Sequence, residues 1–351
     1  MKKLIALTLA LVLVLGLCAC TGGKDDKTTV GILMPTKEQT IWSIQGDRLV
    51  AGFQEAGYAT LIEYAEDDTS KQVMQIENMI TKGADVLVIA AVDSAALTTA
   101  CEKAKAEGIL IIADDRLITN TNAVDYYVTF DLVKMGELQG QYIADALDLA
   151  NAAGPFNLEI FSGSQDDANA VLFYNGAMNV LKPYIDSGKL VVQSGQVDYN
   201  VTAIKGWDSA EARSRMENLL SGYYTDKKLD AVLVAADCLT FGVIPALEDA
   251  GYVPGTDFPV ITGQDAELAA IKNIKAGKQS MTAFLDANEL VKIVVPLVND
   301  LLAGKTVTPS STYNNGVKDV PALTYSPVEI SAENVNYLIE VGFYTEADIN
   351  G

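Results

Sequence analysis

Histidine is absent from the sequence, and its absence excludes several kinds of functional site. Serine or cysteine nucleophiles activated by a histidine base are excluded, as are metal centres with histidine ligands. Basic residues are also scarce: 25 lysines and arginines stand against 46 acidic residues, for a formal charge of −21. Because nucleic acids are bound through basic surfaces, this charge argues against a nucleic-acid partner. Nothing in the sequence calls for a cofactor or a metal.

Long hydrophobic runs are also missing, except for one at the N-terminus. Two lysines precede an apolar run over residues 4–17, which is too short to span a membrane comfortably and is typical of a signal peptide. The run ends in Leu-Cys-Ala-Cys, which resembles a bacterial lipobox with Cys20 as the lipidated residue. We therefore expect residues 1–19 to be removed, Cys20 to anchor the protein outside the cytoplasm, and residues 20–28 to act as a tether. An ordinary secretory signal is the alternative.

The body of the chain holds only two further cysteines, Cys101 and Cys238. They lie far apart in the sequence, Cys101 in a predicted helix and Cys238 directly after a predicted strand. A disulfide is conceivable outside the cytoplasm. Two buried free thiols are the favoured interpretation.

The chain is organised around residues 83–116, which predict a strand, a helix and a second strand. Residues 86–91 form a short apolar run of the kind found in parallel strands that are buried on both faces. Ser94 can cap the helix expected over 95–107, Gly108 ends it, and residues 109–113 form the second strand. Strands and helices alternate in the same way through the whole chain, which indicates parallel sheets covered by helices.

Polar residues follow several of the predicted strands. In open α/β sheets, ligands bind outside the carboxyl ends of the strands, so these side chains are candidate binding residues. The candidates found in this way are Asp93, Asp114 and Asp115, with Arg116 directly after them. The length of 351 residues suits two domains, and the unit that contains 83–116 ends near residues 126–130.

Six segments make the chain resemble bacterial periplasmic sugar-binding proteins, the type I substrate receptors of ABC importers. Within this family, the chain resembles the xylose-binding and multiple-sugar-binding kinds. The matching segments, which run from about Val30 to beyond Pro321, are GILMPTKEQTIW, QIENMITKGADVLVIA, DDRLI, YNGAMNVLKPYIDSGKLVV, TGQDAELAAIK and YNNGVKDVP.

The resemblance implies an α/β fold of the type I periplasmic-binding-protein class, with two doubly wound, parallel-sheet, Rossmann-like lobes joined by three hinge crossings. By analogy, the N-terminal lobe holds residues 29–127 plus 265–305, and the C-terminal lobe holds 128–262 plus 318–351. The crossings are expected near 126–130, 261–265 and 307–317. The ligand is expected between the lobes, which close on it.

The resemblance also implies roles for individual residues. Trp42 corresponds to a face on which a sugar stacks, and Asp115 with Arg116 corresponds to an Asp-Arg pair that binds hydroxyl groups. Asn169 and Asp265 match two further polar positions. Weaker candidates are Asp93, Asp114, Asp166, Asp237 and Gln264, together with Trp207 and Phe284, which either line the cleft or pack in a core.

Each strong candidate also has a purely structural interpretation. Trp42 fits the core of a lobe, and Asp115 with Arg116 fits a surface ion pair. Asp265 and Asn169 both stand where they can cap a following helix. These alternatives stay open at the level of the sequence.

The chain departs from the family pattern at five positions. Apolar residues stand where relatives often have polar ones, at Ile41, Ala168, Ala236 and Leu285, and Asp114 replaces a common tyrosine. These changes predict a pocket that is less polar and more negative than in the relatives. We therefore expect a neutral or cationic ligand and the exclusion of uronic acids.

The leading hypothesis is a lipid-anchored sugar receptor that delivers a monosaccharide, xylose- or glucose-like, to a membrane permease. A chemoreceptor is a further candidate partner. A receptor of the same fold for a nucleoside, an amine or a signalling furanose is the alternative. A cytoplasmic sugar-responsive repressor lacks support, because the N-terminus has a lipobox and no helix-turn-helix. An enzyme is disfavoured, although paired carboxylates can carry out acid–base chemistry.

Overall fold

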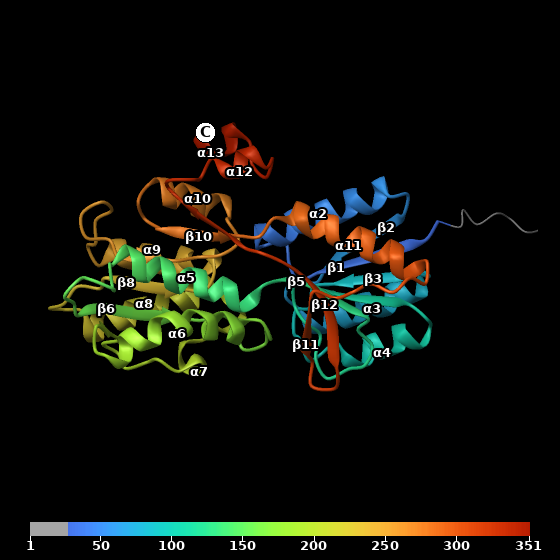
Figure 1. The fold of residues 1–351 in the computed structure, drawn as a ribbon, viewed down its shortest axis with the longest axis horizontal. Coiled ribbons are helices and arrows are strands. Elements are labelled where there is room, and N and C mark those ends of the chain that lie inside the picture. Colours follow the sequence, from blue (N-terminus) through green and yellow to red (C-terminus); the bar gives the residue numbers. More distant parts are fainter. Residues whose placement is uncertain (1–26) are drawn as a thin grey trace, which may run out of the picture.

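The computed structural model describes residues 27–351, so the predicted signal peptide, Cys20 and most of the tether lie outside the described residues. Two lobes lie side by side along the long axis of the molecule (Figure 1). Each contains a sheet with helices on both faces, which agrees with the predicted fold class. Among the helices of residues 27–351, none combines the length and the apolar character needed to cross a membrane.

The first lobe is built on a seven-stranded sheet with the order β11-β12-β5-β4-β3-β1-β2. The pairs are parallel except for β11 with β12. The strands are β1 (Thr29–Met34), β2 (Ala59–Tyr64), β3 (Val86–Ile89), β4 (Leu110–Asp114), β5 (Tyr126–Phe130), β11 (Ser311–Asn314) and β12 (Asp319–Tyr325). The helices are α2 (Thr40–Glu55), α3 (Thr69–Thr81), α4 (Thr98–Ala106) and α11 (Ala287–Leu302).

The second lobe is built on a four-stranded parallel sheet with the order β7-β6-β8-β9. It also contains a separate antiparallel pair of strands, β10 and β13. Its strands are β6 (Phe156–Phe161), β7 (Leu190–Val191), β8 (Ala231–Val234), β9 (Val260–Ile261), β10 (Met281–Phe284) and β13 (Val328–Ser331). Its helices are α5 (Leu132–Ala146), α6 (Ala170–Asp186), α7 (Tyr199–Thr202), the 3-10 helix η1 (Lys205–Trp207), α8 (Ser209–Tyr223), α9 (Asp237–Asp249), α10 (Leu268–Lys275), α12 (Tyr337–Glu340) and α13 (Glu346–Asn350).

Local sequence explains where several of these helices begin. The carboxylates of Asp68, Asp131 and Asp286 accept hydrogen bonds from backbone amides in the first turns of α3, α5 and α11. The predicted cap at Ser94 is wrong, because α4 begins later, after Leu97, and has no side-chain cap. The Ser94 hydroxyl instead accepts a hydrogen bond from the backbone amide of Ala168 in the second lobe.

The chain passes between the lobes three times. The first crossing follows β5, as predicted. The second connects β10 to α11 at residues 285–286, and the third connects β12 to β13 at residues 326–327. The second and third crossings were therefore predicted about 20 to 25 and about 10 to 20 residues too early in the chain, respectively.

This shift changes the predicted division into lobes. Helix α10 and strand β10, which the sequence assigned to the first lobe, pack against α9 and α5 of the second lobe. Strand β12, which was assigned to the second lobe, pairs with β5 in the first sheet. The prediction failed because the order of strands in a sheet depends on pairing between distant segments, which local patterns do not encode.

Candidate functional site

A cavity of about 390 Å³ lies between the two lobes. Side chains from both lobes surround it, and the carboxyl ends of β4 and β6 lead into loops at this place. The lining residues are Gln39, Ile41, Trp42, Asp115, Arg116, Asp167, Phe173, Trp207, Ala236, Cys238, Gln264 and Asp265. The location agrees with the general rule that ligands bind beyond the carboxyl ends of parallel strands.

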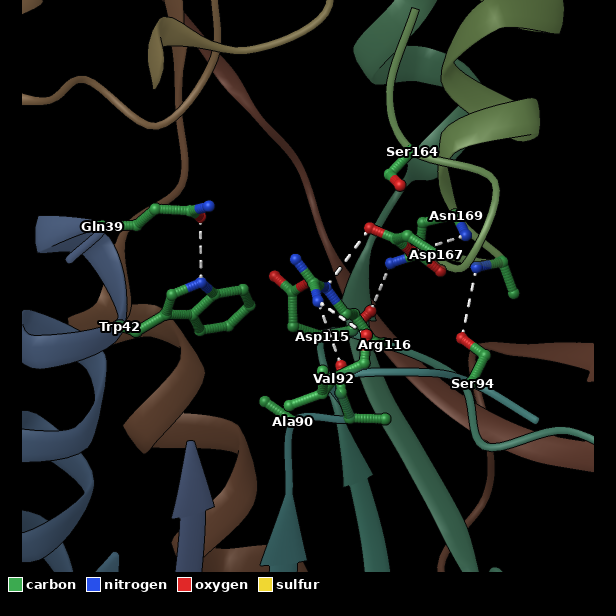
Figure 2. A network of polar contacts seen from close by, with 12 residues as sticks. Gln39, Trp42, Ala90, Val92, Ser94, Asp115, Arg116, Ser164, Asp167 and Asn169 are labelled. Carbon is green, nitrogen blue, oxygen red and sulfur yellow. Dashed lines mark hydrogen bonds and ion pairs between the residues drawn. The ribbon is translucent and has the colours of Figure 1, made fainter. Parts of the chain in front are cut away.

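The first lobe contributes an aromatic and ionic wall (Figure 2). Trp42 lies in the first turns of α2, is buried, and donates a hydrogen bond from Nε1 to Oε1 of Gln39 at 3.1 Å. Asp115 and Arg116 directly follow β4. The guanidinium carbon of Arg116 lies 5.0 Å from the centroid of the Trp42 ring, a distance at which a cation and an aromatic face attract each other.

Arg116 is held by backbone oxygens and by one carboxylate. Its Nη1 donates to the carbonyl oxygens of Ala91 and Val92 at 3.1 and 3.4 Å, directly after β3. Its Nε lies 3.3 Å from Oδ2 of Asp167 in the second lobe. The arginine is therefore fixed in place, and its charge is matched by a carboxylate that also lines the cavity.

The second lobe contributes two aromatic residues. Phe173 lies in the first turn of α6, and Trp207 ends η1. Trp207 is 8% exposed, and its Nε1 has no hydrogen-bond acceptor within residues 27–351. A buried indole N–H normally has an acceptor, so this donor has unused hydrogen-bonding capacity.

Close helix packing sets the position of Phe173. Helices α5 and α6 meet through glycines, and a Cβ at Gly136 would lie 1.8 Å from the carbonyl oxygen of Phe173. A Cβ at Gly176 would lie 2.1 Å from the carbonyl oxygen of Val133. Only glycine permits this approach at either position, and the approach brings the start of α6 to the cavity.

A buried carboxylate supports the loop that carries Gln264 and Asp265. Asp237 is fully buried, and its oxygens accept hydrogen bonds from Gln279 Nε2 at 2.7 Å, from Thr282 Oγ1 at 2.9 Å and from the backbone amide of Glu267 at 3.0 Å. Its own amide donates to the carbonyl of Gln264 at 2.9 Å. Asp237 therefore positions the loop from within the lobe.

The lobes also touch each other directly at one edge of the cavity (Figure 2). The amide of Ser94 donates to the carbonyl of Asp166 at 3.1 Å. Asn169 donates from Nδ2 to the carbonyl of Asp115 at 2.5 Å, and its Oδ1 lies 2.9 Å from the hydroxyl of Tyr127. These contacts hold the loops after β3 and β4 against the loop after β6.

Three of the cavity residues have an unusual backbone conformation. Asp115, Trp207 and Asp265 have positive φ angles of 59°, 56° and 96°. Aspartate tolerates this region better than most residues, but a bulky residue such as tryptophan rarely adopts it. Such strain, about 1–3 kcal/mol per residue, tends to persist where the surroundings of a functional site hold it in place.

Burial alters the acidity of the carboxylates. Desolvation, reinforced by Asp167, raises the pKa of Asp115 to about 8, although Arg116 acts in the opposite direction. Desolvation, reinforced by Glu267, raises the pKa of Asp265 to about 7. Burial also raises the pKa of Asp167, against the lowering effect of Arg116. The cavity thus concentrates carboxylates that one arginine does not neutralise.

The structure brings together Trp42, Asp115, Arg116, Trp207, Gln264 and Asp265 from among the predicted site residues. The other predicted residues have different environments. Asp93 accepts hydrogen bonds from the amides of Ala95 and Ala96 in a local turn, and the carboxylate of Asp166 is exposed beside the contact with Ser94. Asn169 ties the two lobes together rather than lining the cavity.

Three further predicted residues lie behind the cavity. Asp114 is fully buried, and its Oδ2 accepts from Gln45 Nε2 at 2.8 Å. Asp237 supports the loop from within the lobe, and Phe284 packs against Tyr337 and Phe343 in a core. The prediction treated every residue after a strand alike, but Asp114 faces the protein interior while its neighbour Asp115 lines the cavity.

Sequence reasoning missed Gln39, Asp167, Phe173 and Cys238 as cavity residues. Asp167 directly follows the predicted Asp166. It would have been found if both adjacent aspartates had been named as candidates, as they were for Asp114 and Asp115. Gln39 precedes the predicted Trp42 by less than one helical turn, while Phe173 and Cys238 lie in first turns of helices and have no distinguishing local pattern.

Cys101 and Cys238 are both buried free thiols, as favoured from the sequence. Residues 27–351 contain no group of three or more candidate ligands arranged to hold a metal.

The sequence matches the family model described as "Periplasmic binding protein domain" over residues 30–306. The chain belongs to the periplasmic binding protein family. The multiple sugar-binding periplasmic receptor ChvE of Rhizobium radiobacter is 48% identical over 99% of both chains. The D-xylose-binding periplasmic protein of Escherichia coli K12 is 35% identical over 88% of both. These two relatives agree with the resemblance seen in the sequence.

A solved structure has the same fold and substantial sequence identity. The ABC transporter solute-binding protein of Clostridium phytofermentans with bound β-D-glucose superposes with a TM-score of 0.87 and 44% identity, covering 92% of this chain and 99% of that one. The chain is thus a substrate-binding protein and not an enzyme. Periplasmic binding proteins work outside the cytoplasm, which agrees with the predicted compartment.

Proposed function

We propose that this periplasmic binding protein is the receptor of a sugar ABC importer and binds a glucose- or xylose-like monosaccharide in the cavity between its lobes. The observation that carries the proposal is the pairing of Trp42 and Trp207, from opposite lobes, around a cavity lined by Asp115, Arg116 and Asp265. The cavity is small and is enclosed by side chains of both lobes, which favours a ligand no larger than a single sugar ring.

The side chains match the two kinds of surface that a sugar presents. The flat faces carry C–H groups, which pack well against indole rings. The edges carry hydroxyl groups, which donate to carboxylates such as Asp115 and Asp265 and accept from Arg116. Hydrogen bonds to charged groups contribute about 1.5–3 kcal/mol each, so a few of them account for specific binding.

The charge of the cavity favours a ligand that is not an anion. Asp115, Asp167 and Asp265 line the cavity with a single cation, Arg116, among the described residues. When these carboxyl groups are ionised, they repel a carboxylate on the ligand. Uronic acids are therefore expected to bind much more weakly than neutral sugars.

Ligand binding is expected to favour the closed arrangement of the lobes. Arg116 contacts Asp167 across the cavity, and Asn169 contacts Asp115, so some closing contacts exist between the lobes themselves. A ligand that touches both tryptophans adds contacts available only in the closed form, and this difference shifts the equilibrium toward closure.

The anchor and the partners belong to the same proposal. The Leu-Cys-Ala-Cys sequence supports lipidation at Cys20, which would keep the receptor at the membrane surface next to its permease. A chemoreceptor that recognises the closed form is a further partner. Mass spectrometry of the mature protein tests the anchor, because a free Cys20 or cleavage elsewhere would contradict it.

The direct test is thermal unfolding of the soluble form, residues 21–351, with a panel of pentoses, hexoses, uronic acids and nucleosides. A ligand at 100 times its dissociation constant is expected to add about 2.7 kcal/mol to the free energy of unfolding. Glucose or xylose should raise the midpoint, and galacturonate should not. A shift with a nucleoside and with none of the sugars would contradict the proposal.

A further inference from the structure

A second, outer pocket adjoins the cavity between the lobes. It has an empty volume of about 830 Å³ and shares Gln39, Trp207 and Cys238 with the inner cavity. Glu38 and Asp67 of the first lobe and Asp208 and Glu267 of the second line its remaining sides. The three shared residues place the two pockets side by side, so the outer pocket is the nearest space for a group attached to a sugar in the inner cavity.

Glu267 distinguishes this pocket from an ordinary acidic surface. Its side chain lines the pocket, the residue is 7% exposed, and its Oε1 has no hydrogen-bond partner within the described residues. Glu38 and Asp208, in contrast, are exposed. A buried carboxylate without a donor is costly, and a ligand that supplies a donor removes that cost.

The surroundings of Glu267 provide no cation for it. The inner cavity has three lining carboxylates, and the outer pocket has four. The one basic residue that lines either pocket in the described part of the chain is Arg116, which is already paired with Asp167. Burial raises the pKa of Glu267 to about 7, as expected for a carboxyl group that lacks a compensating charge.

We propose that the outer pocket is a subsite for an ammonium group and that the receptor prefers sugars that carry a protonated amine. Glu267 accepts the hydrogen bond from the amine, and the Trp207 ring, which lines both pockets, offers an aromatic face to the cation. The sugar ring occupies the inner cavity. This inference rests on the proposed sugar-binding function and names the class of sugar.

The test compares sugars that differ in one substituent. Calorimetric titration of residues 21–351 at fixed pH and ionic strength would use D-glucose, D-glucosamine, kanosamine and the glucose analogue aminated on its exocyclic carbon. Each amino sugar replaces one hydroxyl by an ammonium group of similar size. At least one of them is expected to bind about tenfold more tightly than glucose, since an ionic hydrogen bond to a buried carboxylate exceeds a neutral one.

A matched pair of variants assigns the effect to Glu267. Glu267→Gln keeps the shape and removes the charge, and it should lower the ratio of amino-sugar to glucose affinity by about tenfold. Glu55→Gln makes the same change in net charge at the exposed end of α2, away from both pockets, and should leave the ratio unchanged.

The outcomes separate this inference from the proposed function. If glucose binds and every amino sugar binds equally or more weakly, the ammonium subsite is overturned and the sugar receptor stands. If no sugar binds, both fail. An unchanged ratio in Glu267→Gln overturns the role of Glu267. If that variant does not fold, the ratios measured with the wild-type protein still decide the class of ligand.

Discussion

The two lobes build their walls of the cavity in different ways. In the first lobe, consecutive residues after one strand, Asp115 and Arg116, form the polar part of the wall, and backbone carbonyls hold the arginine. In the second lobe, the wall is assembled from four separate segments, and the loop of Gln264 and Asp265 is supported by the buried side chain of Asp237. The first wall depends on local chain geometry, whereas the second depends on long-range side-chain hydrogen bonds.

The strongest test of this difference removes the support in the second lobe. Asp237→Ala leaves Gln279, Thr282 and the amide of Glu267 without their shared acceptor. We expect the free energy of unfolding to fall by about 3 kcal/mol, because several buried donors lose a partner. Urea denaturation measures the loss. Asp166→Ala, an exposed acid on the same lobe, serves as the control and should change stability by less than about 0.5 kcal/mol.

The first lobe also contains a buried carboxyl group, Asp114, and the pH dependence of stability tests its contribution. Burial, together with Asp115, raises the pKa of Asp114 to about 8, against a lowering hydrogen bond from Gln45. A raised pKa means that the folded state holds the proton more tightly than the unfolded state does. The stability from this group is therefore present at low pH and is lost as the pH rises through about 8.

The wild-type protein should accordingly lose stability as the pH rises from about 4, the ordinary pKa of an aspartate, to about 8, with Asp114 contributing about 1.4 kcal/mol of loss per pH unit over this range. Asp114→Asn should flatten this part of the profile and make the protein more stable than the wild type at the alkaline end. Chemical denaturation at several pH values provides the comparison. A variant profile as steep as that of the wild type would show that Asp114 is not the source.

Substituting the two tryptophans, one in each lobe, compares how much each wall of the cavity contributes to sugar affinity. Nε1 of Trp42 already has an acceptor in Gln39 of its own lobe, whereas that of Trp207 has none within residues 27–351. Trp207→Phe should therefore lower sugar affinity by about 1.5 kcal/mol, through loss of a donor to the ligand, and Trp42→Phe should lower it less. Titration calorimetry measures both. Equal losses would mean that the two rings act only as stacking surfaces.

The contact between the lobes is expected to have the smallest effect. Asn169→Ala removes the hydrogen bonds to Asp115 and Tyr127 without removing a residue from the cavity lining. We expect a loss of about 1 kcal/mol in ligand affinity, because the closed form becomes less favourable. Small-angle scattering of the unliganded variant should show a more open average shape than the wild type. An unchanged shape together with reduced affinity would instead place Asn169 in contact with the ligand.

The sequence was sufficient for the features that depend on short segments. The strands predicted over residues 86–91 and 109–113 correspond to β3 and β4 to within two residues at each end, because each is a short apolar run. Asp115 and Arg116 were found because they directly follow a buried strand. The family resemblance added Trp42 and Asp265, which local pattern alone does not distinguish from core and cap residues.

Features that depend on distant contacts were beyond the sequence. The positions of the second and third crossings follow from the pairing of β12 with β5 and of β10 with β13. The choice between Asp166 and Asp167, or between Asp114 and Asp115, depends on which side chain faces the opposite lobe. The cavity role of Phe173 depends on the close packing of α5 and α6 through glycines. Each of these is decided by tertiary geometry.

The threefold crossing also has a consequence for the order in which the protein can assemble. Strand β12 completes the first sheet beside β5, yet it is made after the whole four-stranded sheet of the second lobe. During synthesis, the edge of β5 that pairs with β12 therefore stays unpaired until nearly the entire chain has left the ribosome. A nascent chain whose first lobe cannot finish early stays open to threading through an export channel, which suits a protein destined for the outside of the cell.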